Sequence, residues 1–211
     1  MASSSQDLPA PTLTLQKCLV RPWHPADAPS LARGADSRAV AAFLRDRFPH
    51  PYTLADADGW IAMNLAPPLL NWAIVCPTSG AVMGGIGLVP GQDVYSAGCE
   101  LGYWIGEAFW GRGVMSELVP AFVRWVLAGG AGAGVGSGGG GVVERVWASV
   151  FAENAASRRV LEKSGFVFEG RLRRAVVKNG VCMDELVYSA IRTDTPVCTG
   201  SETRGCKEVS G

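Results

Sequence analysis

CELGYWIGEAFWGRGVMSELVPAFVRWV, residues 99–126, is the stretch from which the rest of the chain is interpreted. An apolar, strand-like segment leads into a bend at Gly106 to Phe109, and a Gly-Arg-Gly turn at 111–113 then opens a helix. Pro120 removes one backbone donor from that helix and predicts a kink. Apolar residues recur along the helix at three- and four-residue spacing, which is typical of one buried face: Met115, Leu118, Val119, Phe122, Val123 and Val126.

A strand, a glycine turn and a helix in succession form an anion-binding arrangement. The first N–H groups of a helix have no partner within it, and the helix dipole adds partial positive charge at the same end. Gly111 and Gly113 lack the Cβ atoms that would keep an oxygen away, and Arg112 adds a cation. This turn therefore predicts a phosphate site held mainly by main chain.

Length and charge restrict the class of protein. The 211 residues are 48% apolar, with 19 basic and 19 acidic side chains, which suits one domain with tails. A net charge of zero gives no general attraction to nucleic acid or to an anionic membrane. No apolar run approaches the roughly 20 residues of a membrane helix, and the N-terminal residues lack a signal pattern. We expect a cytoplasmic protein, monomeric or homodimeric, without nucleic-acid or membrane partners.

Cysteine and histidine usage argues against a metal site. The two histidines, His24 and His50, each stand beside a proline. The six cysteines form no CxxC pair and fall mostly in strand-like runs, so buried free thiols are expected rather than disulfides or zinc ligands: Cys18, Cys76, Cys99, Cys182, Cys198 and Cys206.

The expected organisation is a disordered lead-in over residues 1–12, one domain over 13–192 and a flexible tail over 193–211. Short helices are expected near Asp27–Leu31 and Arg38–Leu44, then one capped by Thr53 and one over Ala155–Ser164 that Gly165 ends. Asn179-Gly180 predicts a hairpin turn. Strands are expected at Leu13–Arg21, Trp72–Cys76, Val82–Val89, Ala97–Ile105, Val143–Phe151, Phe166–Leu172, Ala175–Val177 and Val181–Ala190.

A glycine run over residues 129–141 imitates a nucleotide-binding motif. Gly134, Gly136 and Gly139 satisfy GxGxxG by letter. The run follows a helix and precedes a strand, however, which reverses the context of a dinucleotide site. We therefore expect a flexible loop insertion rather than a nicotinamide cofactor.

The order of these elements, the turn WGRGVMSE (110–117) and the segment VFAENAASRRVLEKSGFVFEGRLRR (150–174) resemble the GCN5-related N-acetyltransferases, the GNAT family. Within it the chain resembles the branch of ribosomal-protein N-terminal acetyltransferases, whose EN…S..VLEK.GF pattern matches Glu153 to Phe166. The resemblance implies an α/β fold with a mixed, mostly antiparallel sheet of about seven strands. It also implies a splay between the fourth and fifth strands, and helices on both faces.

The resemblance further implies acetyl-CoA as cosubstrate, no metal, and direct attack by a primary amine in a ternary complex. The family's pyrophosphate loop, (Q/R)xxGx(G/A), falls on residues 110–115, where Trp110 and Met115 depart from the pattern and Gly113 keeps it. The residues that the resemblance assigns to the cofactor are Tyr103, Trp104, Ile105, Trp110, Gly111, Arg112, Gly113, Val114, Met115, Asn154 and Ser157.

Two residues are candidates for catalysis. Glu100 is an acid in a strand of small and apolar residues, so we predict that it faces a cleft as general base; an ordinary outward-facing position is the alternative. The resemblance implies that Ser157 is the acid for the leaving thiolate and that Asn154 lies near the pantetheine; ordinary helix capping is the alternative for Asn154. A peptide or protein N-terminal amine is the favoured acceptor. A small-molecule amine, such as an antibiotic or polyamine, and a catalytically silent acyl-CoA-binding module remain open.

Overall fold

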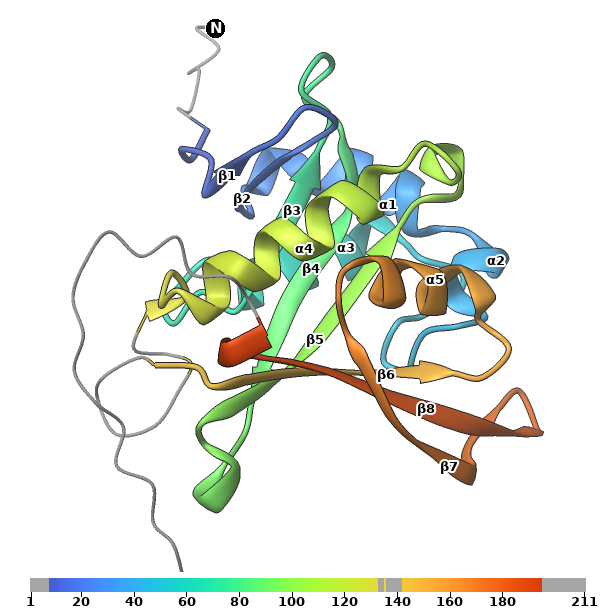
Figure 1. The fold of residues 1–211 in the computed structure, drawn as a ribbon. Helices are drawn as coiled ribbons and strands as arrows, with labels where there is room; N and C mark the ends of the chain where they lie inside the picture. The colour runs from blue at the N-terminus through green and yellow to red at the C-terminus, as the bar shows by residue number, and fades with distance from the viewer. Residues whose placement is uncertain (1–7, 133–134, 136–141, 195–211) are drawn as a thin grey trace, which may run out of the picture.

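The computed structural model describes residues 8–132, 135 and 142–194. Its centre is one sheet of eight strands in the order β1-β2-β3-β4-β5-β6-β8-β7 (Figure 1). Neighbouring strands are antiparallel except β5 and β6, which are parallel. The strands are β1 Leu13–Thr14, β2 Leu19–Pro22, β3 Asn71–Val75, β4 Val82–Pro90, β5 Gly98–Ile105, β6 Arg145–Phe151, β7 Val167–Lys178 and β8 Val181–Ile191.

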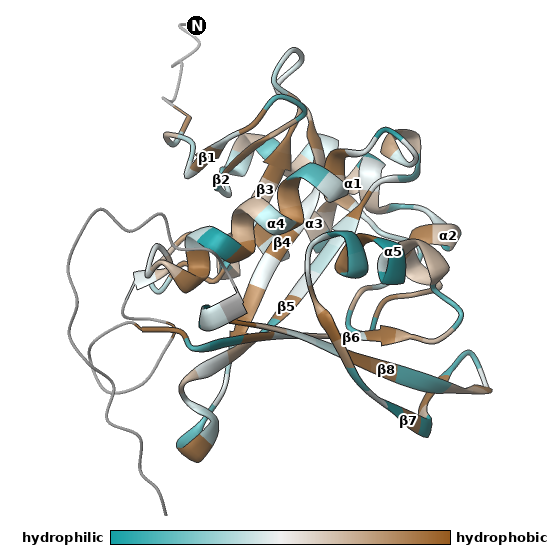
Figure 2. Ribbon diagram, viewed as in Figure 1, coloured by the Kyte–Doolittle hydropathy of each residue, from teal (hydrophilic) through white to brown (hydrophobic). Residues whose placement is uncertain are grey.

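Helices cover both faces of the sheet, as the resemblance implied. On one face, α4 and α5 pack over the larger core, which includes Phe122 and Leu161. On the other face, α1 and α3 enclose a smaller core that includes Leu31 and Ile61. Both α4 and α5 carry hydrophilic and hydrophobic residues, as helices with one buried face do (Figure 2). The helices are α1 Ala28–Ala35, α2 Arg38–Ala41, α3 Leu54–Met63, α4 Val114–Leu127 and α5 Ala155–Lys163.

Most of the local predictions are confirmed. The helix after the glycine turn is α4, and it continues through Pro120. Thr53 begins α3 with a capping box, in which its hydroxyl accepts from the Asp56 N–H and the Asp56 carboxylate accepts from the Thr53 N–H. At the β7–β8 turn, Asn179 and Gly180 both have positive φ, as a tight hairpin requires.

Two strand predictions are wrong. Residues 13–21 do not form one strand, because the N–H of Leu15 bonds to the carbonyl of Cys18 at 2.9 Å and turns the chain back between β1 and β2. Conversely, the two strands expected within 166–177 are one long strand, β7, with irregular register between Leu172 and Val176. A bulge is tolerated there because β7 is an edge strand.

The sheet opens between β5 and β6. These two strands pair only from Gly98 to Glu100, opposite Arg145 to Trp147. Beyond that point β5 stays with β4 as far as Ile105, while β6 stays with β8 as far as Phe151. The predicted splay is thus confirmed, between the strands expected as fourth and fifth. It leaves a wedge that starts beside Glu100.

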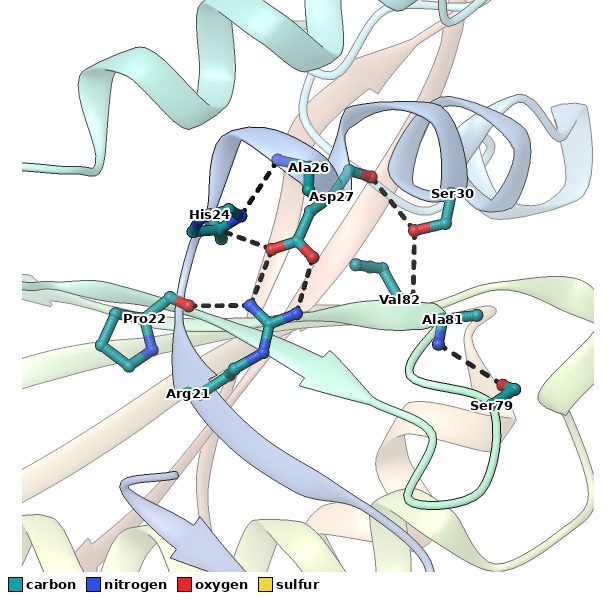
Figure 3. A network of polar contacts seen from close by, with 9 residues as sticks. All are labelled: Arg21, Pro22, His24, Ala26, Asp27, Ser30, Ser79, Ala81 and Val82. Carbon is teal, nitrogen blue, oxygen red and sulfur yellow. Dashed lines mark hydrogen bonds and ion pairs between the residues drawn. The ribbon is translucent and has the colours of Figure 1, made fainter. Parts of the chain in front are cut away.

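A buried ion pair fixes α1 to the sheet (Figure 3). Arg21 at the end of β2 donates to both carboxylate oxygens of Asp27, at 2.6 and 2.8 Å, and each side chain is only 4% exposed. Asp27 also accepts from the His24 N–H at 2.9 Å. Three residues further along, Ser30 donates to the Asp27 carbonyl and accepts from the Val82 N–H of β4. The network therefore joins β2, α1 and β4.

Several expectations concern parts of the chain that fall largely outside the described residues: the lead-in, the tail, the glycine run, Cys198 and Cys206. Of the described cysteines, Cys18 and Cys99 are free and buried as expected, whereas Cys182 is exposed and Cys76 half-exposed. Across residues 8–132, 135 and 142–194, no helix has the length and apolar character needed to span a bilayer. In the same residues, no cluster of three metal-ligating side chains occurs.

Candidate functional site

The glycine turn lies at the end of β5, beside the wedge. Gly111 and Gly113 have φ of +71° and +74°, a region that side-chain-bearing residues rarely adopt. Gly113 is the N-cap of α4 and provides no side-chain acceptor for the helix's first N–H groups. A Cβ at Gly111 would meet nothing within 4 Å, so the turn is open above that residue. Its backbone donors therefore fit a phosphate group.

Lys17, which the sequence analysis missed, lies beside this turn. Its Nζ donates to the Arg112 carbonyl at 3.0 Å. The Glu117 carboxylate in the first turn of α4 holds the lysine's segment by accepting from the Gln16 and Lys17 N–H groups. Arg112 itself lies over the Phe109 ring, 5.6 Å from its centroid. Lys17 and Arg112 both line a cavity next to the turn, so two cations neighbour the predicted phosphate site.

The other residues of the turn contribute mainly backbone. Val114 and Met115 are buried in the α4 core, so only their main chain borders the turn. Trp110 is 45% exposed, and its Nε1 donates to the Ile105 carbonyl at 2.8 Å. This bond anchors the turn to the last residue of β5.

A hydroxyl pair bridges the wedge. The Tyr103 hydroxyl on β5 is 2.8 Å from the Ser157 Oγ on α5. Burial raises the pKa of Tyr103 to about 12, partly offset by the hydrogen bond to Ser157. The phenol thus stays protonated near neutral pH and can donate. Tyr103 and Ser157 are 54 positions apart in the sequence, and the fold brings them together.

Asn154 is the N-cap of α5. Its side chain accepts from the Ser157 N–H at 3.0 Å, which is the capping role considered from the sequence. The cap also fixes the turn of α5 that presents Ser157 to Tyr103. A contact between Asn154 and the cofactor stays a prediction.

Glu100 lies on the opposite face of β5 from Tyr103, because alternate strand residues face alternate sides. Its side chain is 17% exposed and forms an ion pair with Arg45 from the segment between α2 and α3. Trp104 shares this face, and its ring packs against Phe48 with centroids 5.3 Å apart. A contact between Trp104 and the cofactor stays a prediction.

Gly113 gives the first testable prediction. In Gly113→Val, the new Cβ would lie 2.6 Å from the Lys17 Nζ, and valine disfavours a φ of +74°. We expect the Kd for acetyl-CoA, measured by calorimetry, to rise at least tenfold while the domain stays folded. Gly180→Val is the matched control, because it places valine at a similar φ in the remote β7–β8 turn. Unchanged affinity in Gly113→Val would show that the phosphate site is misplaced.

A parallel strand pair that opens into a wedge, with a glycine-opened helix at its end, is the arrangement that the resemblance to the GNAT family implied. Residues 17–167 match the family model described as "Acetyltransferase (GNAT) domain", and the chain belongs to this family. It is 36% identical over 93 residues to the uncharacterized N-acetyltransferase YoaA of Bacillus subtilis, a match that covers 44% of this chain and 46% of that protein. The chain thus spans about half the length of the curated relatives it matches.

Solved structures share the fold. A GNAT-family acetyltransferase from Bacillus anthracis superposes with a TM-score of 0.71 at 17% identity, covering 86% of this chain and 98% of that one. RimL, a ribosomal L7/L12 α-N-protein acetyltransferase solved with coenzyme A, gives a TM-score of 0.70 at 19% identity, with the same two coverages. The fold predicted from the sequence is thereby confirmed, with eight strands instead of about seven.

Proposed function

We propose that the protein transfers an acetyl group from acetyl-CoA to a primary amine. The observation that carries this proposal is the placement of Glu100 where β5 and β6 part, with the Tyr103–Ser157 hydroxyl pair on the opposite side of β5. A base and a proton donor on the two sides of one opening suit a reaction that removes a proton from one partner and returns one to the other. The glycine turn at the end of β5 supplies main-chain donors for the pyrophosphate.

The proposed reaction is a direct attack. Glu100, directly or through water, removes a proton from the acceptor's ammonium group. The neutral nitrogen then forms a bond to the acetyl carbon as the carbon–sulfur bond breaks. The departing thiolate takes a proton from the hydroxyl pair formed by Ser157 and Tyr103. The new amide nitrogen gives up its remaining extra proton, which restores the hydroxyl pair, and Glu100 releases the proton that it took to solvent. The products are the acetylated amine and the free thiol of coenzyme A, and the protein holds no covalent intermediate.

For the acceptor we favour the α-amine of a peptide or protein N-terminus. The EN…S..VLEK.GF pattern at Glu153 to Phe166 supports this branch, and the similarity in fold to RimL agrees with it. A small-molecule amine is the second candidate, because one scaffold can serve many acceptors. The partial exposure of Glu100 supports an active enzyme over a silent acyl-CoA-binding module.

The acceptor is tested by measuring thiol release from acetyl-CoA in the presence of N-terminal alanine and serine peptides, polyamines and aminoglycosides. We expect release that depends on the acceptor and is fastest with the peptides, whose α-amino group mass spectrometry should find acetylated. Faster release with polyamines or aminoglycosides would show that a small-molecule amine, and not a peptide N-terminus, is the preferred acceptor. Acetyl-CoA binding without release from any amine would favour the silent module.

Variants of the hydroxyl pair test the proton donor. We expect Tyr103→Phe and Ser157→Ala each to lower kcat by roughly 10²-fold, because general acid catalysis contributes about 10²- to 10⁴-fold. The double variant should lose little more than either single one, since the two hydroxyls act as a unit. Tyr188→Phe is the control, because it removes a hydroxyl that bonds to Glu162 instead. If the fold-loss of kcat in the double variant equals the product of the two single losses, the hydroxyls act independently, which would contradict a shared role.

A further inference from the structure

The segment between α2 and α3 lies against the Glu100 face of the sheet at three points. Phe48 packs on Trp104, Arg45 pairs with Glu100, and Asp46 accepts from the Lys178 Nζ of β7 at 2.7 Å. The bond between Asp46 and Lys178 joins residues more than a hundred positions apart in the sequence. The α2–α3 segment and the β7–β8 hairpin therefore enclose a space next to Arg45, the ion-pair partner of Glu100.

That space is a cavity, and its lining includes Arg45, Glu185, Phe151 and Val176. Glu185 on β8 pairs with Phe151 on β6. Four residues before Phe151 on the same strand, Trp147 pairs with Glu100 on β5. Because alternate residues face the same side, Glu185 and Glu100 lie on one face of the sheet. Burial and the charge of Glu100 raise the pKa of Glu185, and the Arg45 guanidinium lowers it. Arg45 thus pairs with Glu100 and also lines the cavity that Glu185 lines.

We propose that Glu185 and Arg45 are specificity-determining residues that set the charge of the acceptor, an inference that rests on the proposed acetyl transfer at Glu100. Glu100, Glu185 and Arg45 carry one net negative charge when both acids are ionised. One ammonium group balances that charge. The apolar side chains of Phe151 and Val176 suit an uncharged substituent next to the amine. The site therefore selects acceptors with a single positive charge near the reacting nitrogen.

Two peptide amides that differ by one charge test this selection. Ala-Ala-Ala-amide carries only its α-ammonium, and Ala-Lys-Ala-amide carries a second cation. In Glu185→Gln we expect the KM for both peptides to rise about tenfold with kcat within threefold, and Glu185→Asp should restore part of the loss. In Arg45→Ala the three-residue group becomes more negative, so the kcat/KM of the dicationic peptide relative to the monocationic one should rise about tenfold.

Arg47→Ala is the matched control, because Arg47 is an exposed arginine of the same segment and does not line the cavity. Its peptide ratio should equal that of the wild type. Arg45 is itself 53% exposed, so its removal should leave the thermal melting temperature nearly unchanged. An unchanged KM in Glu185→Gln, or an equal charge preference in Arg45→Ala and Arg47→Ala, would overturn the inference.

A binding measurement separates this inference from the proposed reaction. The same peptides are titrated into each variant in the presence of coenzyme A, which cannot transfer an acetyl group, and Kd is followed by chemical-shift changes. Binding that weakens about tenfold in Glu185→Gln without any turnover in the wild type would uphold the inference and overturn the proposed reaction. If the wild type turns over but the peptide Kd is unchanged in Glu185→Gln, the proposed reaction is upheld and the inference is overturned.

Discussion

Glu100→Gln should lower kcat for acetyl transfer by about 10²- to 10⁴-fold, because glutamine keeps the shape of the side chain and cannot accept the proton. The Kd for acetyl-CoA should stay within threefold, since Glu100 faces the α1 and α3 side of the sheet, away from Tyr103 and Ser157. The measurements are steady-state rates with an N-terminal alanine peptide and calorimetry with acetyl-CoA.

The pH dependence makes this result specific. A peptide α-amine has a pKa near 8, so raising the pH supplies more neutral nucleophile without a base. The deficit of Glu100→Gln should therefore shrink between about pH 7 and pH 9. Glu144→Gln, which changes an exposed glutamate near the start of β6, is the control and should match the wild type at both pH values. A constant deficit, or none, would remove Glu100 from the role of base.

Arg21→Met should destabilise the fold by about 3–5 kcal/mol, because it leaves the Asp27 carboxylate buried without its counter-ion. Both partners are 4% exposed, and Arg21 donates to both oxygens of Asp27. Loss of the pair should also loosen α1, which Ser30 and Asp27 connect to β4. Urea unfolding, followed by circular dichroism, measures the change in the free energy of unfolding.

An exposed ion pair serves as the matched comparison. Arg145 pairs with Glu169, and these side chains are 36% and 37% exposed. Arg145→Met should therefore cost no more than about 1 kcal/mol. The double variant Arg21→Met with Asp27→Leu should be more stable than Arg21→Met alone, since it buries no unpaired charge. If Arg21→Met and Arg145→Met lower the free energy of unfolding equally, burial does not strengthen the Arg21–Asp27 pair, which contradicts its proposed role in the fold.

The local parts of the site could be predicted from the sequence because their signals are local. The glycine turn, the apolar face of α4, the Thr53 cap and the Asn179-Gly180 hairpin depend on residues within a few positions of one another. The splay came from the resemblance, since nothing in residues 98–100 alone reveals that parallel pairing ends after Glu100.

The missing parts of the site depend on contacts between distant residues. Lys17 meets Arg112 across 95 positions, and Arg45 meets Glu100 across 55. Glu185 approaches Glu100 only through the register of β5, β6 and β8. Strand alternation could have separated Tyr103 from Trp104, because adjacent residues face opposite sides. That rule would have placed the Tyr103 and Trp104 side chains on opposite faces of β5.

The most direct test of the central claim is a calorimetric titration of the full chain with acetyl-CoA, with NAD as the control ligand. Saturable binding of acetyl-CoA at one site per chain, and no heat of binding with NAD, is the result that the glycine turn and the wedge predict. Absence of acetyl-CoA binding would contradict the proposed transferase and leave only the fold and the family.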